Sequence, residues 1–377
     1  MRHDLLLKGG TLIDPAQGLD GIYDLAIGDG KVAAVGGNLD PAQARRVLDV
    51  SGKLVLPGLI DLHSHVFNRM GLGTDPDRAC LQRGTTTTVD GGSAGAATID
   101  AFRAYVATPA RARVYAWIHL GTMGLIDPRV GELLHLAYAD VDACVQAIEA
   151  NRDLVVGIKL RLSTYAIGAG TIAVLRLLRQ AADAAKVPVM THIGGSAENL
   201  PTILEWLRPG DVVTHILTGW PNGALDPHGK VHAAVREAQQ AGIYFDGAQG
   251  RMHVSYPVVR AMLEQGFLPN GLSTDITTAT YADPTFHLPG VMNRFLAAGA
   301  PFKDLVPMVT SNPSRQLARE PLLGTLPVGA PADIAVLEWE EGDFLIKDSF
   351  GVELPLQKRL APFMTLKDGQ YVSTDTD

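Results

Sequence analysis

The sequence is poor in cysteine and lacks long runs of one residue type. Only two of its 377 residues are cysteines, Cys80 and Cys144, and no CxxC pair is present, so a disulfide framework is not expected. No apolar run approaches the length of a membrane span, and no basic run suggests nucleic acid or an anionic membrane as a partner. The first residues lack the long apolar core of a signal peptide. Together these absences predict a cytoplasmic protein that binds neither nucleic acid nor a membrane.

The composition is typical of a well-buried α/β protein with many short turns. Hydrophobic residues make up 46% of the chain, which also contains 40 glycines and 23 prolines. Such a chain is unlike a disordered one, in which apolar residues are scarce. The length exceeds what one small core accommodates, so a large domain accompanied by a smaller one is expected.

The two ends of the chain have similar sequence patterns. Residues 4–56 contain short apolar runs broken by Gly, Asp and Pro, and the tetrapeptide GDGK predicts a tight hairpin turn. The C-terminal residues return to short strands and tight turns, including KDGQ. We therefore predict that residues 1–56 and 322–377 pair into one small β-sandwich domain built from both chain termini.

Between the ends, over residues 57–321, short apolar strands alternate with longer helical patterns. Near-continuous apolar strands separated by amphipathic helices indicate a parallel sheet covered by helices. Eight such units are countable and no GxGxxG motif opens the first helix, so a (β/α)8 TIM barrel is favoured over a doubly wound open sheet. The candidate strands are VLPGLIDLHSH, TTTTVDGGS, RVYAWIHLG, VVGIKLRLS, VPVMTHIGG, DVVTHILTG, IYFDGAQG and GLSTDITT.

Polar residues that bind metals well follow several of these strands. In a (β/α)8 barrel the chemistry lies at the carboxyl ends of the strands, and side chains two residues apart on a strand point to the same side. Imidazole and carboxylate suit zinc and neighbouring divalent metals. The candidate ligands outnumber the three protein ligands of one catalytic zinc, so they predict two metal ions with a bridging anion. A lysine that has reacted with carbon dioxide to form a carbamate would supply that anion. The candidate ligands are His63, His65, Lys159, His192, His215 and Asp275.

These residues, and motifs along nearly the whole chain, resemble the amidohydrolase superfamily of binuclear metallohydrolases. The matching segments include LLLKGGTLIDP, VLPGLIDLHSH, TSNPSRQLA and LPVGAPADIAVLE. Within that superfamily the chain is most similar to the dihydroorotase-like, deacetylase-type branch, on the segments RGTTTTVDGGSAG, GIKLRLS and FDGAQG.

The resemblance implies a role for each candidate ligand. It implies that His63, His65 and Asp275 hold the more buried metal and that His192 and His215 hold the more exposed one. It also implies that carboxylated Lys159 and a hydroxide bridge the two ions, which are expected to be zinc. Asp275 would then take the proton from the attacking hydroxide and pass it to the leaving group, as a positioned carboxylate can.

Departures from the branch concern residues that face the substrate. Gln249 stands where the branch usually has the histidine of an FDxGHG motif, Thr277 replaces a histidine after Asp275, and Thr218 replaces an asparagine after His215. None of these is a metal ligand, so they bear on the substrate rather than on the chemistry.

Four residues are weaker candidates for contact with the substrate. They are Arg161, Tyr165, Gln249 and His253. Arg161 faces the same side of its strand as Lys159, where it could grip a substrate carboxylate or pair with an acid such as Asp90. We expect Tyr165, His119, His253 and His287 to lie on rim loops.

The predicted function is a binuclear metal-dependent hydrolase. It would cleave an amide or ester bond of a small acylated acid, such as an N-acyl amino acid or an O-acyl hydroxy acid. The alternative is hydrolysis of a cyclic amide, of the dihydroorotase or hydantoinase kind. Deamination is less expected, because the resemblance implies that single-metal deaminases lack the strand-borne lysine. A metal-free, non-catalytic scaffold is the remote alternative. The sequence leaves open whether the protein forms a homo-oligomer.

Overall fold

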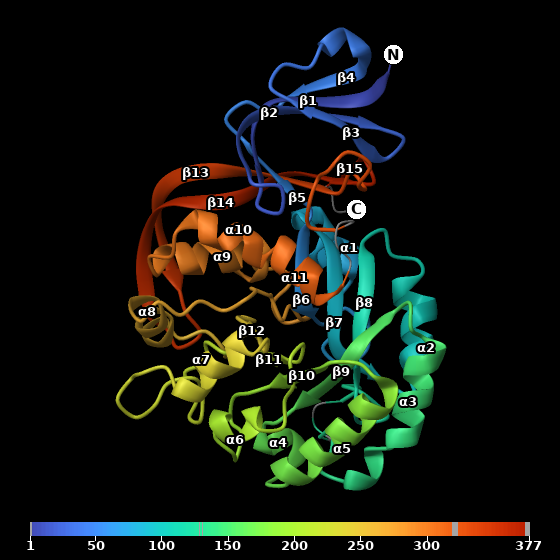
Figure 1. Ribbon diagram of the computed structural model, residues 1–377, viewed down its shortest axis with the longest axis vertical. Coiled ribbons are helices and arrows are strands. Elements are labelled where there is room, and N and C mark those ends of the chain that lie inside the picture. Colours follow the sequence, from blue (N-terminus) through green and yellow to red (C-terminus); the bar gives the residue numbers. More distant parts are fainter. Residues whose placement is uncertain (1, 128, 130, 319–322, 374–377) are drawn as a thin grey trace.

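The computed structural model describes residues 2–127, 129, 131–318 and 323–373, and these residues form two sheets (Figure 1). The first is a curled sheet in which all neighbouring strands pair in parallel. Its seven strands within the described residues follow the order β12-β11-β10-β9-β8-β7-β6. They are β6 (Leu59–Ser64), β7 (Thr85–Gly95), β8 (Arg113–His119), β9 (Val155–Arg161), β10 (Val189–His192), β11 (Val212–Thr214) and β12 (Tyr244–Asp246).

The run GLSTDITT, expected to be an eighth strand, does not form a regular strand over segment 271–276. It makes one parallel bridge, between Gly271 and Asp246, and its later residues bond to β6 instead: the amide of Asp275 donates to the carbonyl of His63 at 2.7 Å. Asp275 has a φ of +50°, which interrupts the extended backbone. The segment therefore lies between the two outer strands of the curled sheet and is hydrogen-bonded to both.

Helices cover the curled sheet, as the alternating pattern predicts (Figure 1). Between the predicted strands the structure has, among others, helices over Val141–Ala150, Thr171–Ala185 and Ala233–Gln240. None of the helices in the described part of the chain is long and apolar enough to span a bilayer. The helices are α1 (Pro76–Ala79), α2 (Ile99–Phe102), α3 (Val141–Ala150), α4 (Thr164–Ile167), α5 (Thr171–Ala185), α6 (Leu200–Leu204), α7 (Ala233–Gln240), α8 (Tyr256–Glu264), α9 (Leu288–Ala297), α10 (Phe302–Met308) and α11 (Ser311–Gln316).

The second sheet joins the two ends of the chain, as their similar sequences predict. Its central order is β15-β14-β13-β5-β1-β2-β3, with β4 paired to β1. Leu7, Leu25, Val336 and Leu366 belong to one buried apolar cluster that this sheet encloses. The strands are β1 (His3–Asp14), β2 (Leu19–Gly28), β3 (Lys31–Gly36), β4 (Ala44–Asp49), β5 (Leu54–Pro57), β13 (Ile334–Lys347), β14 (Glu353–Lys367) and β15 (Gln370–Val372).

The run VLPGLIDLHSH, predicted as one strand, is divided between the two sheets. β5 ends at Pro57 and pairs with β1 and β13, whereas β6 begins at Leu59 and pairs with β7. The amide of Gly58, between them, donates to the carbonyl of Asp333 at 2.8 Å. The other predicted boundary, between residues 321 and 322, lies outside the described residues.

The hairpin of β13 and β14 extends beyond its own sheet and lies along α9 (Figure 1). The side chain of Asn293 in α9 both donates to and accepts from the backbone of Leu360. At the hairpin tip, Asp348 accepts a hydrogen bond from the amide of Tyr256 at 2.8 Å, and the amide of Ser349 donates to the carbonyl of Val254 at 2.9 Å. The tip thus fixes the end of the loop that leads from β12 into α8.

Candidate metal centre

The six predicted ligands meet at the carboxyl end of the curled sheet. One group consists of His63 and His65, at and just after the end of β6, with Asp275 from segment 271–276; each offers a ligand atom, and these atoms lie within 4.8 Å of one another. Asp275 Oδ1 is 3.1 Å from His65 Nε2 and 3.6 Å from His63 Nε2. The two histidines with period-two spacing therefore face one carboxylate, as the sequence predicts.

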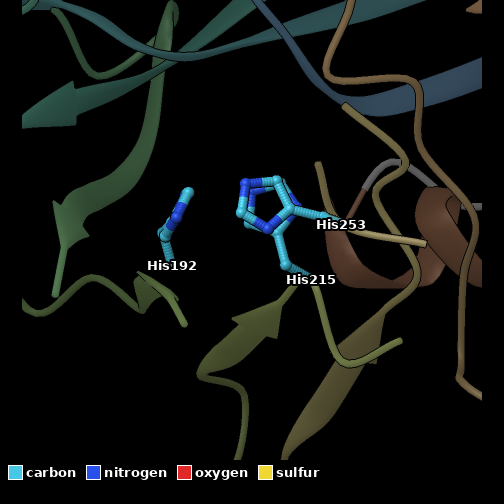
Figure 2. Close-up of side chains that lie close together, drawn as sticks. All are labelled: His192, His215 and His253. Atoms are coloured by element: carbon cyan, nitrogen blue, oxygen red, sulfur yellow. The ribbon is translucent and has the colours of Figure 1, made fainter. Parts of the chain in front are cut away.

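A second group contains three imidazoles. His192 ends β10, His215 follows β11, and His253 lies in the loop before α8; their ligand atoms also lie within 4.8 Å of one another. Figure 2 shows the rings of His215 and His253 one behind the other, with His192 beside them. The centroids of the His215 and His253 rings are 3.9 Å apart, and those of His192 and His215 are 4.2 Å apart.

Asp275 of the first group also faces the second, and Lys159 lies beside His63 of the first. Asp275 Oδ2 is 3.8 Å from His215 Nε2, so the same carboxylate that faces His63 and His65 also faces the second group. Lys159, on β9, is fully buried, and its Nζ lies 2.8 Å from His63 Nε2. Within the described residues, Lys159 forms no ion pair with a carboxylate, and its other polar contact is Met190 Sδ at 3.5 Å.

Two glycines of β7 make room for these side chains. A Cβ atom on Gly91 would lie 2.3 Å from Cδ2 of His63, and one on Gly92 would lie 2.6 Å from Cβ of Lys159. Both separations are shorter than non-bonded carbon atoms allow, so larger residues at these positions would displace His63 and Lys159. The GG pair in VDGGS is thus part of the local design of the site.

Hydrogen bonds behind the imidazoles orient their rings. His63 Nδ1 is 2.9 Å from Thr214 Oγ1, which donates its proton to Asp246 Oδ2 at 2.7 Å. The threonine hydroxyl therefore accepts from Nδ1–H of His63, which leaves Nε2 as the nitrogen with a free lone pair. His65 Nδ1 is similarly 2.9 Å from Ser93 Oγ. Histidine ligands of metals are commonly held this way, with one nitrogen bonded to the protein and the other on the metal.

The protonation states of the site suit metal binding. Burial, followed by the nearby Lys159 ammonium, holds the pKa of His63 well below its usual range, and burial does the same for His192 and His215. Burial also lowers the pKa of Lys159 to about 7. For Asp275, burial opposes ionisation, but the adjacent imidazoles outweigh it and bring the pKa well below its usual range. His63, His192 and His215 are thus neutral and the carboxylate is charged, which are the forms that bind metals.

Two of the candidate ligands have unusual backbone conformations. His215 has a φ of +69° and Asp275 a φ of +50°. This left-handed region is uncommon for residues other than glycine, and such residues cluster at functional sites. Both residues directly follow strand-like segments, so the left-handed turn sets the direction in which each side chain enters the site.

Beside the metal ligands lies a cavity of about 170 Å³. Arg161, at the end of β9, lies in its wall, and the Arg161 guanidinium carbon is 5.1 Å from the centre of the Tyr165 ring. Behind it, Arg161 Nε is 2.7 Å from Glu132 Oε1, and Glu132 Oε2 is 2.9 Å from His119 Nε2. The residues that line the cavity are His65, Leu72, Arg161, Tyr165, His192, Arg251, Met252, His253, Asp275, Thr277 and Ala279.

Several weaker expectations need correction or refinement. His119 is not on a rim loop but ends β8, where it is fully buried and held by Glu132. Arg161 pairs with Glu132 rather than with Asp90, whose carboxylate accepts from the amides of Val66 and Ser93.

Gln249 and His287 both lie outside the wall of the cavity. Gln249 is buried, and its side-chain amide donates to the carbonyl of Thr285 at 3.0 Å. The His287 ring is likewise occupied by the carbonyl of Tyr281.

Three residues that support the site were not predicted from the sequence. Glu132 lies in a loop without periodic pattern, so nothing in the sequence distinguished it. Thr214 and Asp246 support His63 from two neighbouring strands. Their signal was available, since polar residues at the ends of buried strands need partners.

The donor set fits divalent metal ions. Within the described residues, His192 Nε2 and His215 Nε2 are buried nitrogens without any hydrogen-bond partner, although leaving such an atom unpaired costs about 1–3 kcal/mol. Both nitrogens belong to a cluster of neutral imidazoles beside a charged carboxylate. Zinc and similar ions bind this kind of donor set. A cation between them would satisfy nitrogens that the protein itself leaves unpaired.

Comparison with known proteins identifies the family of the chain. Residues 54–373 match the model of the amidohydrolase family. A deacetylase of Agrobacterium fabrum is 34% identical over 341 residues, which is 89% of this chain and 83% of that protein. Two crystal structures each superpose with a TM-score of 0.89: an adenine deaminase, 29% identical over 98% of this chain and 99% of that chain, and a dihydroorotase, 31% identical over 98% and 97%. The chain belongs to the amidohydrolase family.

Proposed function

We propose that the protein is a binuclear metal-dependent hydrolase that cleaves the amide or ester bond of a small acylated acid. The observation that carries this proposal is the meeting of two ligand groups, one around His63 and one around His192, across the single carboxylate of Asp275. One catalytic metal needs three protein ligands, and here more than three are brought together, namely His63, His65, His192, His215 and Asp275. The similarity to a deacetylase over most of the chain supports the same class of reaction.

The candidate ligands divide between two proposed metal positions. His63, His65 and Asp275 would hold one ion, and His192 and His215 the other, with zinc as the expected metal. Lys159 is buried, has no carboxylate partner among the described residues, and has a pKa lowered to about 7. It is suited to react with carbon dioxide, because the neutral amine is the reacting form. The resulting carbamate would provide the anionic bridge. Two bound ions supply a water-derived nucleophile near neutral pH and polarise the scissile carbonyl.

The chain's own groups then perform the remaining tasks. Asp275, which is ionised and lies in the cavity wall, accepts a proton from the attacking water and returns it to the leaving group. Thr214 and Ser93 hold the rings of His63 and His65 in fixed orientations, so the site needs no rearrangement when substrate enters. The rings of His192 and His253, with Leu72, line the cavity in which the substrate would bind.

The cavity favours a small anionic substrate. Arg161 and Arg251 both lie in its wall, and a guanidinium can bind a carboxylate bidentately. Its volume of about 170 Å³ accommodates only a few heavy atoms beyond the scissile group. Tyr165 and Met252 are exposed at 58% and 44% and border the same cavity, so an apolar part of the substrate would contact them. An N-acyl amino acid or an O-acyl hydroxy acid combines these features.

A second candidate is hydrolysis of a cyclic amide. It is favoured by the likeness to a dihydroorotase structure, at 31% identity over 98% of this chain. The metal centre proposed above would serve either reaction, because both begin with attack on an amide carbonyl. The likeness to an adenine deaminase structure makes adenine a third compound that the assay must include.

We also propose the barrel and the second domain expected from the sequence. Segment 271–276 would complete an eight-membered (β/α)8 barrel, since it is hydrogen-bonded towards both β12 and β6. The sheet formed by both ends of the chain would be a β-sandwich domain, comprising residues 1–56 and 322–377, beside it. We further propose that the protein acts in the cytoplasm.

One assay tests the proposed function. Zinc-loaded and chelator-treated protein would be incubated with N-acyl amino acids, O-acyl hydroxy acids, five- and six-membered cyclic amides, and adenine. The proposal expects hydrolysis of an acylated acid that disappears when metal is removed and returns when zinc is added. Turnover of cyclic amides alone, or of adenine alone, would replace it with the corresponding alternative. Undiminished turnover by fully metal-free protein would refute the metal centre itself.

A further inference from the structure

The loop between β12 and α8 brings a third imidazole to the second ligand group. His253 lies in the wall of the cavity, and its ring centre is 3.9 Å from that of His215 and 4.8 Å from that of His192. Its Nδ1 is buried and has no hydrogen-bond partner in the described structure. Like His192 and His215, His253 thus has one buried nitrogen without a hydrogen-bond partner among the described residues.

The three unpaired nitrogens form a set. In the described residues each imidazole of this group leaves one nitrogen without a partner: His192 Nε2, His215 Nε2 and His253 Nδ1. The two imidazoles of the other group have both nitrogens in contact with polar atoms, since His63 meets Thr214 and Lys159 and His65 meets Ser93 and Asp275. One hydrogen-bonding group of a substrate would satisfy one such nitrogen. One cation would satisfy all three at once.

The loop that carries His253 is held firmly. The carbonyl of Met252 accepts a hydrogen bond from the indole of Trp220 at 3.2 Å. On the other side, the amide of Ser349 donates to the carbonyl of Val254, and Asp348 accepts from the amide of Tyr256. Metal ligands need support of this kind, because a loosely held side chain loses conformational entropy on binding. The tip of the β13–β14 hairpin is therefore a support for His253.

We propose that His253 is a third protein ligand of the second metal position, together with His192 and His215. This inference rests on the proposed metal centre and adds to it a ligand from a loop rather than from a strand end. It predicts a second position that holds its ion by three imidazoles before any bridging group is counted. Its ion should then be retained even when the carbamate on Lys159 is absent.

The test measures metal binding rather than activity. Zinc per chain would be determined after equilibrium dialysis, and the dissociation constants by competition with a chromophoric chelator. His253→Phe keeps an aromatic ring against His215 but removes both nitrogens, and His253→Asn is a smaller second variant. His228→Phe is the matched control, because His228 is exposed on a loop away from the cavity. Circular dichroism would establish that each variant is folded.

The expected result separates this inference from the proposed function. Wild-type protein and His228→Phe should bind two ions, whereas both His253 variants should bind one ion tightly and the second at least about 100-fold more weakly. Loss of a group that merely supports a ligand costs about 10–100-fold in metal affinity, so loss of a ligand should cost at least the upper value. Cobalt-substituted wild type should also differ from the variants in its visible absorption bands. Two ions bound with unchanged affinity by both His253 variants would overturn the inference alone. A wild-type protein that binds no metal would overturn the metal centre as well.

Discussion

Removing the carboxylate of Glu132 should destabilise the protein strongly and spoil the position of Arg161. Glu132 and Arg161 are 6% and 7% exposed, and their charged groups are 2.7 Å apart. Glu132→Ala would leave the Arg161 guanidinium buried without its partner and would also take the acceptor from His119. Loss of one member of a buried ion pair costs about 3–5 kcal/mol. We expect a loss of this size in the free energy of unfolding.

A double-mutant cycle isolates the pair. Glu132→Ala, Arg161→Met and the double variant would be unfolded in urea, with tryptophan fluorescence as the probe. If the cost of Glu132→Ala comes from an unpaired charge, the double variant should regain at least about 2 kcal/mol relative to additive behaviour. The exposed pair of Arg103 and Asp153, which are 34% and 74% accessible, is the matched control. Asp153→Ala should cost less than about 1 kcal/mol.

Loss of the Glu132 charge should also affect function. Arg161 lies in the cavity wall, whereas Glu132 is not among the residues that line it, so under the proposed function Glu132 would affect the substrate through Arg161. Glu132→Gln keeps a hydrogen-bonding side chain of similar shape but loses the charge, so KM for an anionic substrate should rise about tenfold or more while kcat changes less. Additive stability effects, with a coupling energy below about 0.5 kcal/mol, would refute the argument from the buried pair. An unchanged KM would show that Glu132 does not position Arg161.

Three further predictions concern the metal site and its supports. Thr214→Val removes the hydroxyl that holds His63 Nδ1, so zinc affinity measured by chelator competition should fall by about 10–100-fold; unchanged affinity would contradict the role of Thr214. Lys159→Ala removes the proposed bridge, and its hydrolysis rate, assayed with saturating zinc, should be at least about 100-fold below wild type; full activity would exclude the bridge. In metal-free and carbon dioxide-free protein, the pKa of Lys159 is about 7 when folded, against 10.5 for an ordinary lysine. The unfolded chain then binds the extra proton between these values, so stability in urea should rise by about 1.4 kcal/mol per pH unit from about pH 7 to about pH 10. Lys159→Met should lack that rise, and an equal slope in wild type and variant would contradict a depressed pKa.

The parts of the site that follow a periodic pattern could be predicted from the sequence. The spacing of His63 and His65 placed both imidazoles on one side of a strand, and they do face one carboxylate. Parallel strands bring their carboxyl ends together, which is why residues more than a hundred positions apart could be grouped. Glu132 had no such pattern, because its partner is determined by how a long loop folds over β9. The division of one apolar run into β5 and β6 had a local signal that the prediction of one strand passed over, because the dipeptide Pro57-Gly58 at the break is typical of a turn.

The left-handed turns at His215 and Asp275 explain why the site needs the rest of the fold. A strained residue of this kind costs about 1–3 kcal/mol and persists only where its surroundings determine it. At Asp275 the surroundings are two hydrogen bonds that join the segment to β6: its amide donates to the carbonyl of His63, and the amide of His65 donates to the carbonyl of Ile276. The carboxylate that faces both ligand groups is therefore aimed by the backbone of the first ligand strand itself. Substitution by glycine at position 275 would relieve the strain but remove the carboxylate, whereas Asp275→Asn would keep the side chain's shape and the turn. The asparagine variant should thus keep the turn and lose only the stability that the ionised carboxylate gains beside the imidazoles in the metal-free form. It should still lose proton transfer, which separates the backbone role of this residue from its chemical role.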